Sequence, residues 1–227
     1  MHPSSVVRCG LAAAVFAACA TARAGTIDIV PYMGLTPGKW SILQSDGGSW
    51  QSGVSVTSGA NGQVLKNYWY RSHAGAAWTP DGASNVFEIT PTELRIVGLQ
   101  DGADAWVFDP TPSLPRPLTV NKPYFFSTNL KHPATGEKSK MALLVIVTKT
   151  GIAVSTPAGS FTGCIKMRFY SYGGGESEED VNLDCKGRSD VQTWFHRISD
   201  TADPQQESQD GGSTQLIQYG NKNPPFP

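Results

Sequence analysis

Apolar and polar side chains alternate along several segments of this chain. The alternation is plainest over residues 63–71, 85–89 and 93–97, and each of these segments is bounded by Gly, Pro, Asn or Asp. A period of two predicts β-strands with one buried face, and strands about ten residues apart favour antiparallel pairing. Shorter runs of the same kind predict further strands at 105–108, 124–130, 143–147, 164–170, 191–198 and 216–219.

The chain after residue 24 has no segment with the 3.6-residue apolar repeat of a long amphipathic helix. Dinucleotide-binding and P-loop folds, which hold phosphate at the start of a helix that follows a strand, are therefore excluded. We predict an all-β fold, a single-domain antiparallel curved sheet or half-barrel over residues 25–219, with a sandwich as the alternative. Residues 220–227 (GNKNPPFP) should form an extended tail.

The first 24 residues have the pattern of a signal peptide. Arg8 precedes an apolar stretch over residues 9–20, and Ala-Arg-Ala at 22–24 is a cleavage site before Gly25. The apolar stretch is too short for a membrane-spanning helix, so we expect no transmembrane segment in the mature chain. The protein should be exported to the periplasm or the extracellular space. The alternative is a lipoprotein anchored through Cys19.

Cleavage would leave only Cys164 and Cys185, which we expect to form a disulfide in an oxidising compartment. The glycines at 173–175 lie midway between them and indicate a hairpin. If the cysteines face each other directly, however, the apolar residues of the first strand lie opposite Asp180, Asn182 and Asp184. Because a shift of one residue exchanges the two faces of a strand, we expect either a β-bulge or a bond between non-neighbouring strands.

The segment 156–166 (TPAGSFTGCIK) resembles the T-P-A-G-[ST]-F-x-x-C-[LI]-K motif of uncharacterised bacterial secreted proteins and lipoproteins. Residues 35–40 (LTPGKW) resemble the opening of the same group, and Trp194 with residues 216–219 lies where its closing strands lie. The likeness departs at residues 200–203, where a polar loop replaces the group's short Gly-Val-Gly-Leu-Val run. The resemblance implies an all-β fold and export, and it implies no activity.

Charge and residue spacing exclude several functions. Charged residues make up 16% of the chain and the formal net charge is −1, so no basic field attracts nucleic acid. There is no Gly-x-Ser-x-Gly segment, and the mature histidines, His73, His132 and His196, lack metal-ligand spacing. The acidic run at 176–180 lacks the spacing of a calcium loop and is interpreted as a solvated hairpin tip. We therefore expect no metal and no cofactor.

Aromatic residues are the remaining candidates for binding, since their rings can line an apolar pocket or stack on a sugar. Trp50 and Trp78 lie beside predicted turns, and Trp194 and His196 share one face of the segment 191–198, so these four residues form the predicted ligand site. The function that fits best is a non-enzymatic binding module for an apolar small molecule or an envelope component. A structural envelope protein and a hydrolase of glycan or ester are the alternatives.

Overall fold

The computed structural model describes residues 25–173, 176–199 and 208–227, so the predicted signal peptide and Cys19 lie outside it. The described residues form β-strands and two short 3-10 helices, with no α-helix. Accordingly, none of their helices is long and apolar enough to cross a membrane. The elements are β1 (Thr26–Ile27), β2 (Lys39–Ser45), η1 (Asp46–Gly48), β3 (Gln51–Ser58), η2 (Ala60–Gly62), β4 (Val64–Arg71), β5 (Thr79–Pro80), β6 (Ser84–Ile89), β7 (Glu93–Asp101), β8 (Asp104–Asp109), β9 (Ser113–Pro115), β10 (Leu118–Thr119), β11 (Tyr124–Lys131), β12 (Lys138–Thr156), β13 (Gly159–Gly173), β14 (Glu176–Cys185), β15 (Arg188–Ser199) and β16 (Ser208–Asn221).

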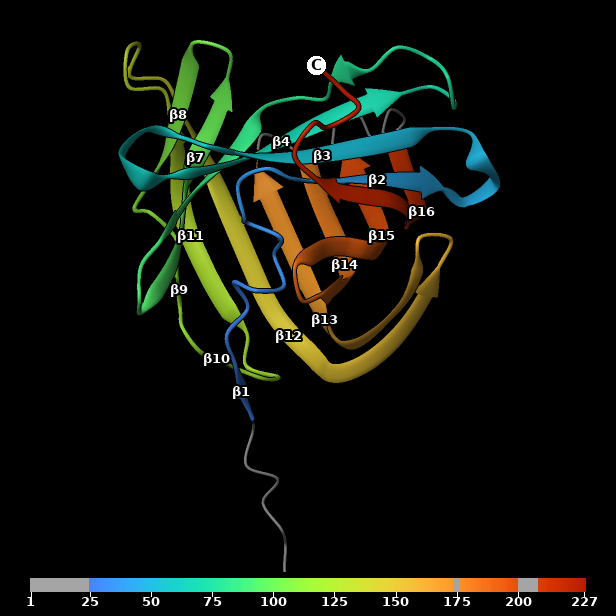
Figure 1. Ribbon diagram of the computed structural model, residues 1–227. Coiled ribbons are helices and arrows are strands. Elements are labelled where there is room, and N and C mark those ends of the chain that lie inside the picture. Colours follow the sequence, from blue (N-terminus) through green and yellow to red (C-terminus); the bar gives the residue numbers. More distant parts are fainter. Residues whose placement is uncertain (1–24, 174–175, 200–207) are drawn as a thin grey trace, which may run out of the picture.

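Twelve of the described strands close into a barrel (Figure 1). The strands pair antiparallel in the order β3-β2-β16-β15-β14-β13-β12-β11-β8-β7-β6-β4, and β4 returns to pair with β3 from Gln51 opposite Arg71 to Ser58 opposite Val64. Two short strands lie off this ring, β5 beside β4 and β9 beside β7, and β1 pairs with β10 separately. The predicted all-β antiparallel curved sheet is confirmed, and its curvature continues to full closure.

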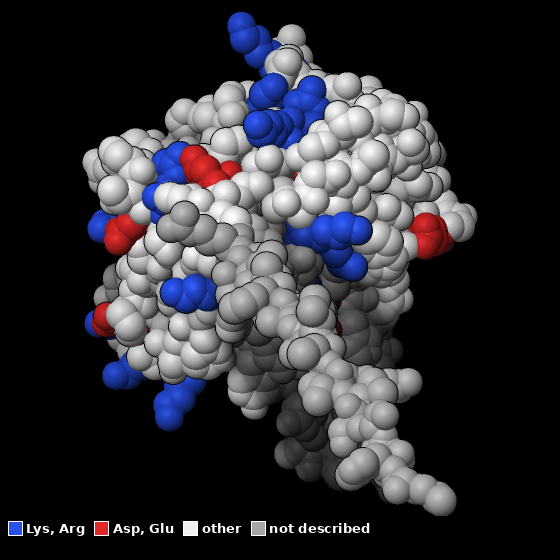
Figure 2. Space-filling model, turned by 90° about the horizontal axis from the view of Figure 1, so that it is seen from below, with Lys and Arg blue, Asp and Glu red and all other residues white. Residues whose placement is uncertain are grey.

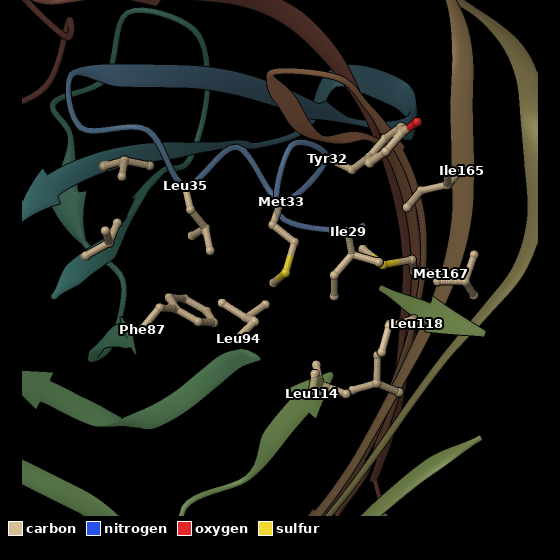
Figure 3. Close-up of a cluster of buried hydrophobic side chains, with 14 residues drawn as sticks. Ile29, Tyr32, Met33, Leu35, Phe87, Leu94, Leu114, Leu118, Ile165 and Met167 are labelled. Atoms are coloured by element: carbon tan, nitrogen blue, oxygen red, sulfur yellow. The ribbon is translucent and has the colours of Figure 1, made fainter. Parts of the chain in front are cut away.

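The end of the barrel nearest β1 is filled by the N-terminal segment 28–35, which we call the plug. A barrel of eight strands can be filled by its own side chains, and one of twelve is wider, so its interior needs further content. Ile29 and Met33 of the plug are buried in one cluster with side chains of β7, β9 and β13 (Figure 3). Arg116 holds the plug through a 2.8 Å ion pair with Asp28. The plug therefore closes one end of the interior.

The hairpin of β12 and β13 is longer than the neighbouring strands and folds back to β16 (Figure 1). Its turn is formed by Pro157 and Ala158 of the TPAG segment. The Ala158 N–H donates a hydrogen bond to the Leu216 carbonyl at 3.2 Å, and the Phe161 ring meets the Tyr219 ring edge-on, with 6.0 Å between centroids. The sequence motif thus marks the docking of this hairpin on β16.

The register of β13 and β14 corrects one prediction. The disulfide between Cys164 and Cys185 is present, as expected. However, its strands are direct neighbours, and the facing pairs run without a shift, so the expected bulge or non-neighbouring bond is wrong. These pairs include Ile165 with Asp184, Met167 with Asn182, and Phe169 with Asp180. Apolar and acidic side chains therefore share the inner face of the barrel.

Candidate binding site in the barrel lumen

A cavity of about 1300 Å³ occupies the barrel interior beyond the plug. Its lining comes from inward-facing positions of the barrel strands, with Met33 of the plug at its base. At the far end it is bordered by Trp50 and by Tyr70, whose side chain is 40% exposed. The cavity, which we call the lumen, is therefore closed by the plug at one end and reaches solvent near Tyr70.

One side of the lumen is apolar. Every second residue of β12 and β13 points inward, which places Leu143 and Val145 beside Met167 and Phe169. Strands β7 and β8 extend this surface with further apolar side chains, of which Ile96 is one. The apolar wall, formed by these inward residues of β7, β8, β12 and β13, can take the hydrocarbon part of a ligand out of water.

The opposite side is mainly polar, because most inward positions of β14, β15, β16 and β2 carry polar side chains, with Leu43 and Phe195 as apolar exceptions. Asn182 faces Thr193, Thr193 faces Thr214, and Thr214 faces Ser45, so one row of polar residues crosses four strands. All four residues line the lumen. This row and Asp184, two residues after Asn182 on β14, form the polar wall.

A buried ion pair crosses the interior from β4 to β15. The Lys66 ammonium lies 2.6 Å from a carboxylate oxygen of Asp190, and Lys66 is only 7% exposed. Burial by itself lowers the pKa of Lys66, but the charge of Asp190, with smaller contributions from Tyr68 and Asp184, raises that pKa above its ordinary value. Lys66 is therefore held as an ammonium ion whose charge is already matched by Asp190.

Asp184 lies beside this pair and is 1% exposed. Its Oδ1 accepts a hydrogen bond of 2.6 Å from the Asp190 N–H. Burial, followed by the negative charge of Asp190, raises the pKa of Asp184 well above its ordinary value. The protonated form of this carboxyl is thereby favoured while nothing else neutralises it.

Three oxygen atoms of the polar wall lack a hydrogen-bond partner among the described residues. They are Asp184 Oδ2, Asn182 Oδ1 and Thr193 Oγ1, and all three are buried. Buried polar atoms without partners are uncommon because each loses its bonds to water. Since the three residues also line the lumen, these atoms lie in its wall without a partner among the described residues.

A second polar group faces the lumen from β4 and β6. The Asn85 amide donates a 2.7 Å hydrogen bond to the Tyr68 hydroxyl, and burial raises the pKa of Tyr68. The acidic run at 176–180, expected as a solvated hairpin tip, belongs to β14, and Glu178 and Asp180 line the lumen. Alternation along a strand sends acidic side chains to both faces here, so the interpretation of a uniformly solvated tip is wrong.

Of the predicted site residues, Trp50 lies in the lumen, where its ring is 6.2 Å from that of Phe195. Trp194 borders the lumen through its strand, but by alternation with Phe195 its ring is on the outer face, 6.0 Å from the Lys166 ammonium. His196 is exposed on that same outer face.

Trp78 lies at the outside of the barrel with the C-terminal tail. Its ring is edge-on to Phe226 at 5.3 Å and 4.3 Å from the Arg71 guanidinium carbon. Phe226 also stacks on Trp69 at 5.5 Å and is itself 5% exposed. Residues 220–227 are therefore anchored to the barrel through this aromatic cluster, and Trp78 contributes to that packing.

Sequence reasoning missed the polar wall, although its signal was visible. The placement of Asp180, Asn182 and Asp184 opposite apolar partners leads to the expectation of a bulge or a bond between non-neighbouring strands, whereas the structure shows that this pairing is the actual register. Within the described residues, no cluster of three or more His, Cys, Asp and Glu side chains is arranged to hold a metal. Comparisons with protein-family models, with curated proteins and with solved structures found no match.

Proposed function

We propose that this protein is an exported, non-enzymatic binding protein that holds a lipid-like small molecule in its lumen. The observation that carries the proposal is the cavity of about 1300 Å³ with one apolar and one polar wall. Pockets for small ligands usually measure about 300–1,000 Å³, so this lumen has room for a long chain. Each buried methylene contributes about 0.8 kcal/mol, which makes an alkyl chain a suitable occupant of the apolar wall.

Export is part of the proposal. The disulfide fits an oxidising compartment, since such bonds are rare in the cytosol. A signal peptide over residues 1–24, with a lipid anchor at Cys19 as the alternative, would bring the protein there. In a bacterial envelope, molecules with long apolar chains are abundant and need a carrier or receptor to leave the membrane.

The proposal is tested by titrating protein that has been stripped of bound molecules with Nile red, a neutral dye, and displacing the dye with dodecanol. Leu143→Trp places a large ring in the lumen, whereas the matched variant Phe125→Trp changes a residue on the adjacent strand that is 66% exposed on the outer face. We expect saturable binding of the dye. Leu143→Trp should weaken this binding by about tenfold or more, because the tryptophan side chain occupies space that the ligand needs. Phe125→Trp should bind as the wild type does.

Two outcomes would count against lumen binding. One is the absence of saturable binding to the wild-type protein. The other is an equal effect of the two tryptophan substitutions, which would place the dye on the outer surface.

A further inference from the structure

We propose that the polar wall selects ligands whose polar end is an amine, so that the natural ligand is a cationic amphiphile rather than a fatty acid. This inference rests on the proposed function and adds the chemistry of the head group to it. It is carried by the three unpaired oxygen atoms of the polar wall and by the arrangement of charges around Lys66.

The three unpaired oxygen atoms can be satisfied by hydrogen-bond donors of a ligand. Asn182 Oδ1 can only accept, Asp184 Oδ2 can only accept once the carboxyl is ionised, and Thr193 Oγ1 can accept as well as donate. Asn182 and Thr193 face each other across β14 and β15, and Asp184 lies two residues further on the same face, about 7 Å along the strand. A primary ammonium group carries three N–H donors and can bond to whichever of these acceptors lie within its reach. A carboxylate head has no donor to offer.

The charges around Lys66 also favour an amine head group over a carboxylate. The one lysine of the described lumen lining, Lys66, is already paired with Asp190. An anionic head group that approached Lys66 would meet the carboxyl groups of Asp184 and Asp190 beside it. An ammonium ion would instead supply a counter-charge to ionised Asp184, since the charge of Lys66 is already matched by Asp190. Six described lumen residues are acidic, namely Asp46, Asp81, Glu178, Asp180, Asp184 and Asp190, of which Asp46 and Asp81 are exposed.

This acidic interior is a local property of the lumen. The whole chain has a formal net charge of only −1. Figure 2, which looks at the plugged end, shows Lys and Arg side chains spread over the outside with fewer Asp and Glu between them. The described lumen lining thus carries more acidic than basic side chains.

Binding of an amine should be coupled to a proton on Asp184. The charged groups that act on this carboxyl are Lys66 from β4 and Asp190 from β15, while Ile165 opposite it on β13 is apolar. Burial raises the pKa of Asp184, which favours its protonated form in the empty lumen, and an ammonium head group would take the place of that proton. Amine affinity should therefore rise with pH until Asp184 is ionised in the empty lumen, and dodecanol affinity should not change.

The test compares dodecylamine, dodecanol and dodecanoate, which share one chain and differ in the head group, as competitors of Nile red. We expect dodecylamine to bind about tenfold or more tightly than dodecanoate to the wild type, with dodecanol between them, because a charge-assisted bond is stronger than a neutral one. Calorimetry in buffers of different ionisation enthalpy should show proton release for the amine alone.

Two variants test whether Asp184 causes the preference for an amine. Asp184→Asn keeps the shape and the hydrogen bond from Asp190 but removes the counter-charge, so it should weaken dodecylamine by about fivefold or more and abolish proton release, with dodecanol unchanged. Glu179→Gln, which removes a carboxylate from the opposite face of β14, where it pairs with Arg168, is the matched control and should change neither.

The outcomes separate the two proposals. Equal binding of the three compounds, or preference for dodecanoate, would overturn selection of amines while lumen binding stands. Loss of dodecylamine and dodecanol binding alike in Asp184→Asn would assign Asp184 a structural role and also overturn it. If none of the compounds binds saturably to the wild type, the proposed function fails together with this inference.

Discussion

At the scale of single residues, the polar interior depends on Lys66. Its ammonium is buried, and it joins two strands that are not neighbours in the barrel. Removing charges from water has a cost that only close pairing offsets, so a buried pair of this kind is sensitive to the loss of either partner. Without Lys66, the carboxyl groups of Asp190 and Asp184 would face each other with no positive charge between them.

We predict that Lys66→Met lowers the free energy of unfolding by about 3–5 kcal/mol, because Asp190 becomes an uncompensated buried charge. The measurement is urea unfolding at neutral pH. The double variant Lys66→Met with Asp190→Leu should recover most of the loss, since neither charge then remains.

Arg95→Met is the matched control for this prediction. Arg95 pairs with Glu88 and Glu93 at the surface, where water screens the charges, so its removal should leave the unfolding midpoint nearly unchanged. Equal losses in Lys66→Met and Arg95→Met would contradict the structural importance that we assign to the buried pair.

At the scale of elements, the alternation of apolar and polar residues predicts some strands and misses others. Alternation located β4, β6 and β7 well, and the count of cysteines left after cleavage predicted the bond between Cys164 and Cys185. It did not locate β2 or β3, where Ser41, Ser45 and Ser55 are buried and blur the contrast between the two faces.

The polar wall escaped prediction for a related physical reason. A rule that sends polar residues to solvent assumes that the inner face is a dry core. A barrel of twelve strands has an interior of its own that is not filled, so Asn182 and Asp184 can face inward beside Met167 and Phe169. The barrel closes through the pairing of β3 with β4, and no local sequence pattern predicts that pairing.

At this scale we predict how much the disulfide contributes to stability. It joins residues 21 apart in sequence, and the double variant Cys164→Ser with Cys185→Ser should be less stable by about 3 kcal/mol, because the unfolded chain gains conformational freedom. Urea unfolding measures the loss, and reduced wild-type protein should unfold at the same midpoint as the variant.

Alkylation provides the check on the bond itself. Neither cysteine should react under denaturing conditions before reduction, and both should react afterwards. Labelling of both thiols in unreduced protein, or an unchanged midpoint in the double variant, would contradict the role assigned to the disulfide.

At the scale of the whole molecule, closure and plugging together explain the lumen. Twelve strands enclose more space than their own side chains fill, and the plug takes up only one end of it. What remains is a chamber with an apolar wall on β7, β8, β12 and β13 and a polar wall on β14, β15, β16 and β2. A molecule with one apolar and one polar part fits such a chamber in a single orientation.

The most direct test of this account is a crystal structure of the stripped protein soaked with 12-bromododecan-1-ol, in which anomalous scattering locates the bromine atom. The account predicts a bromine peak inside the lumen, against the part of the apolar wall that lies on β7 near Ile96, with the hydroxyl toward Asn182 and Thr193. A bromine peak confined to the outer face, for example beside the exposed Phe125, with the lumen holding only water, would contradict it.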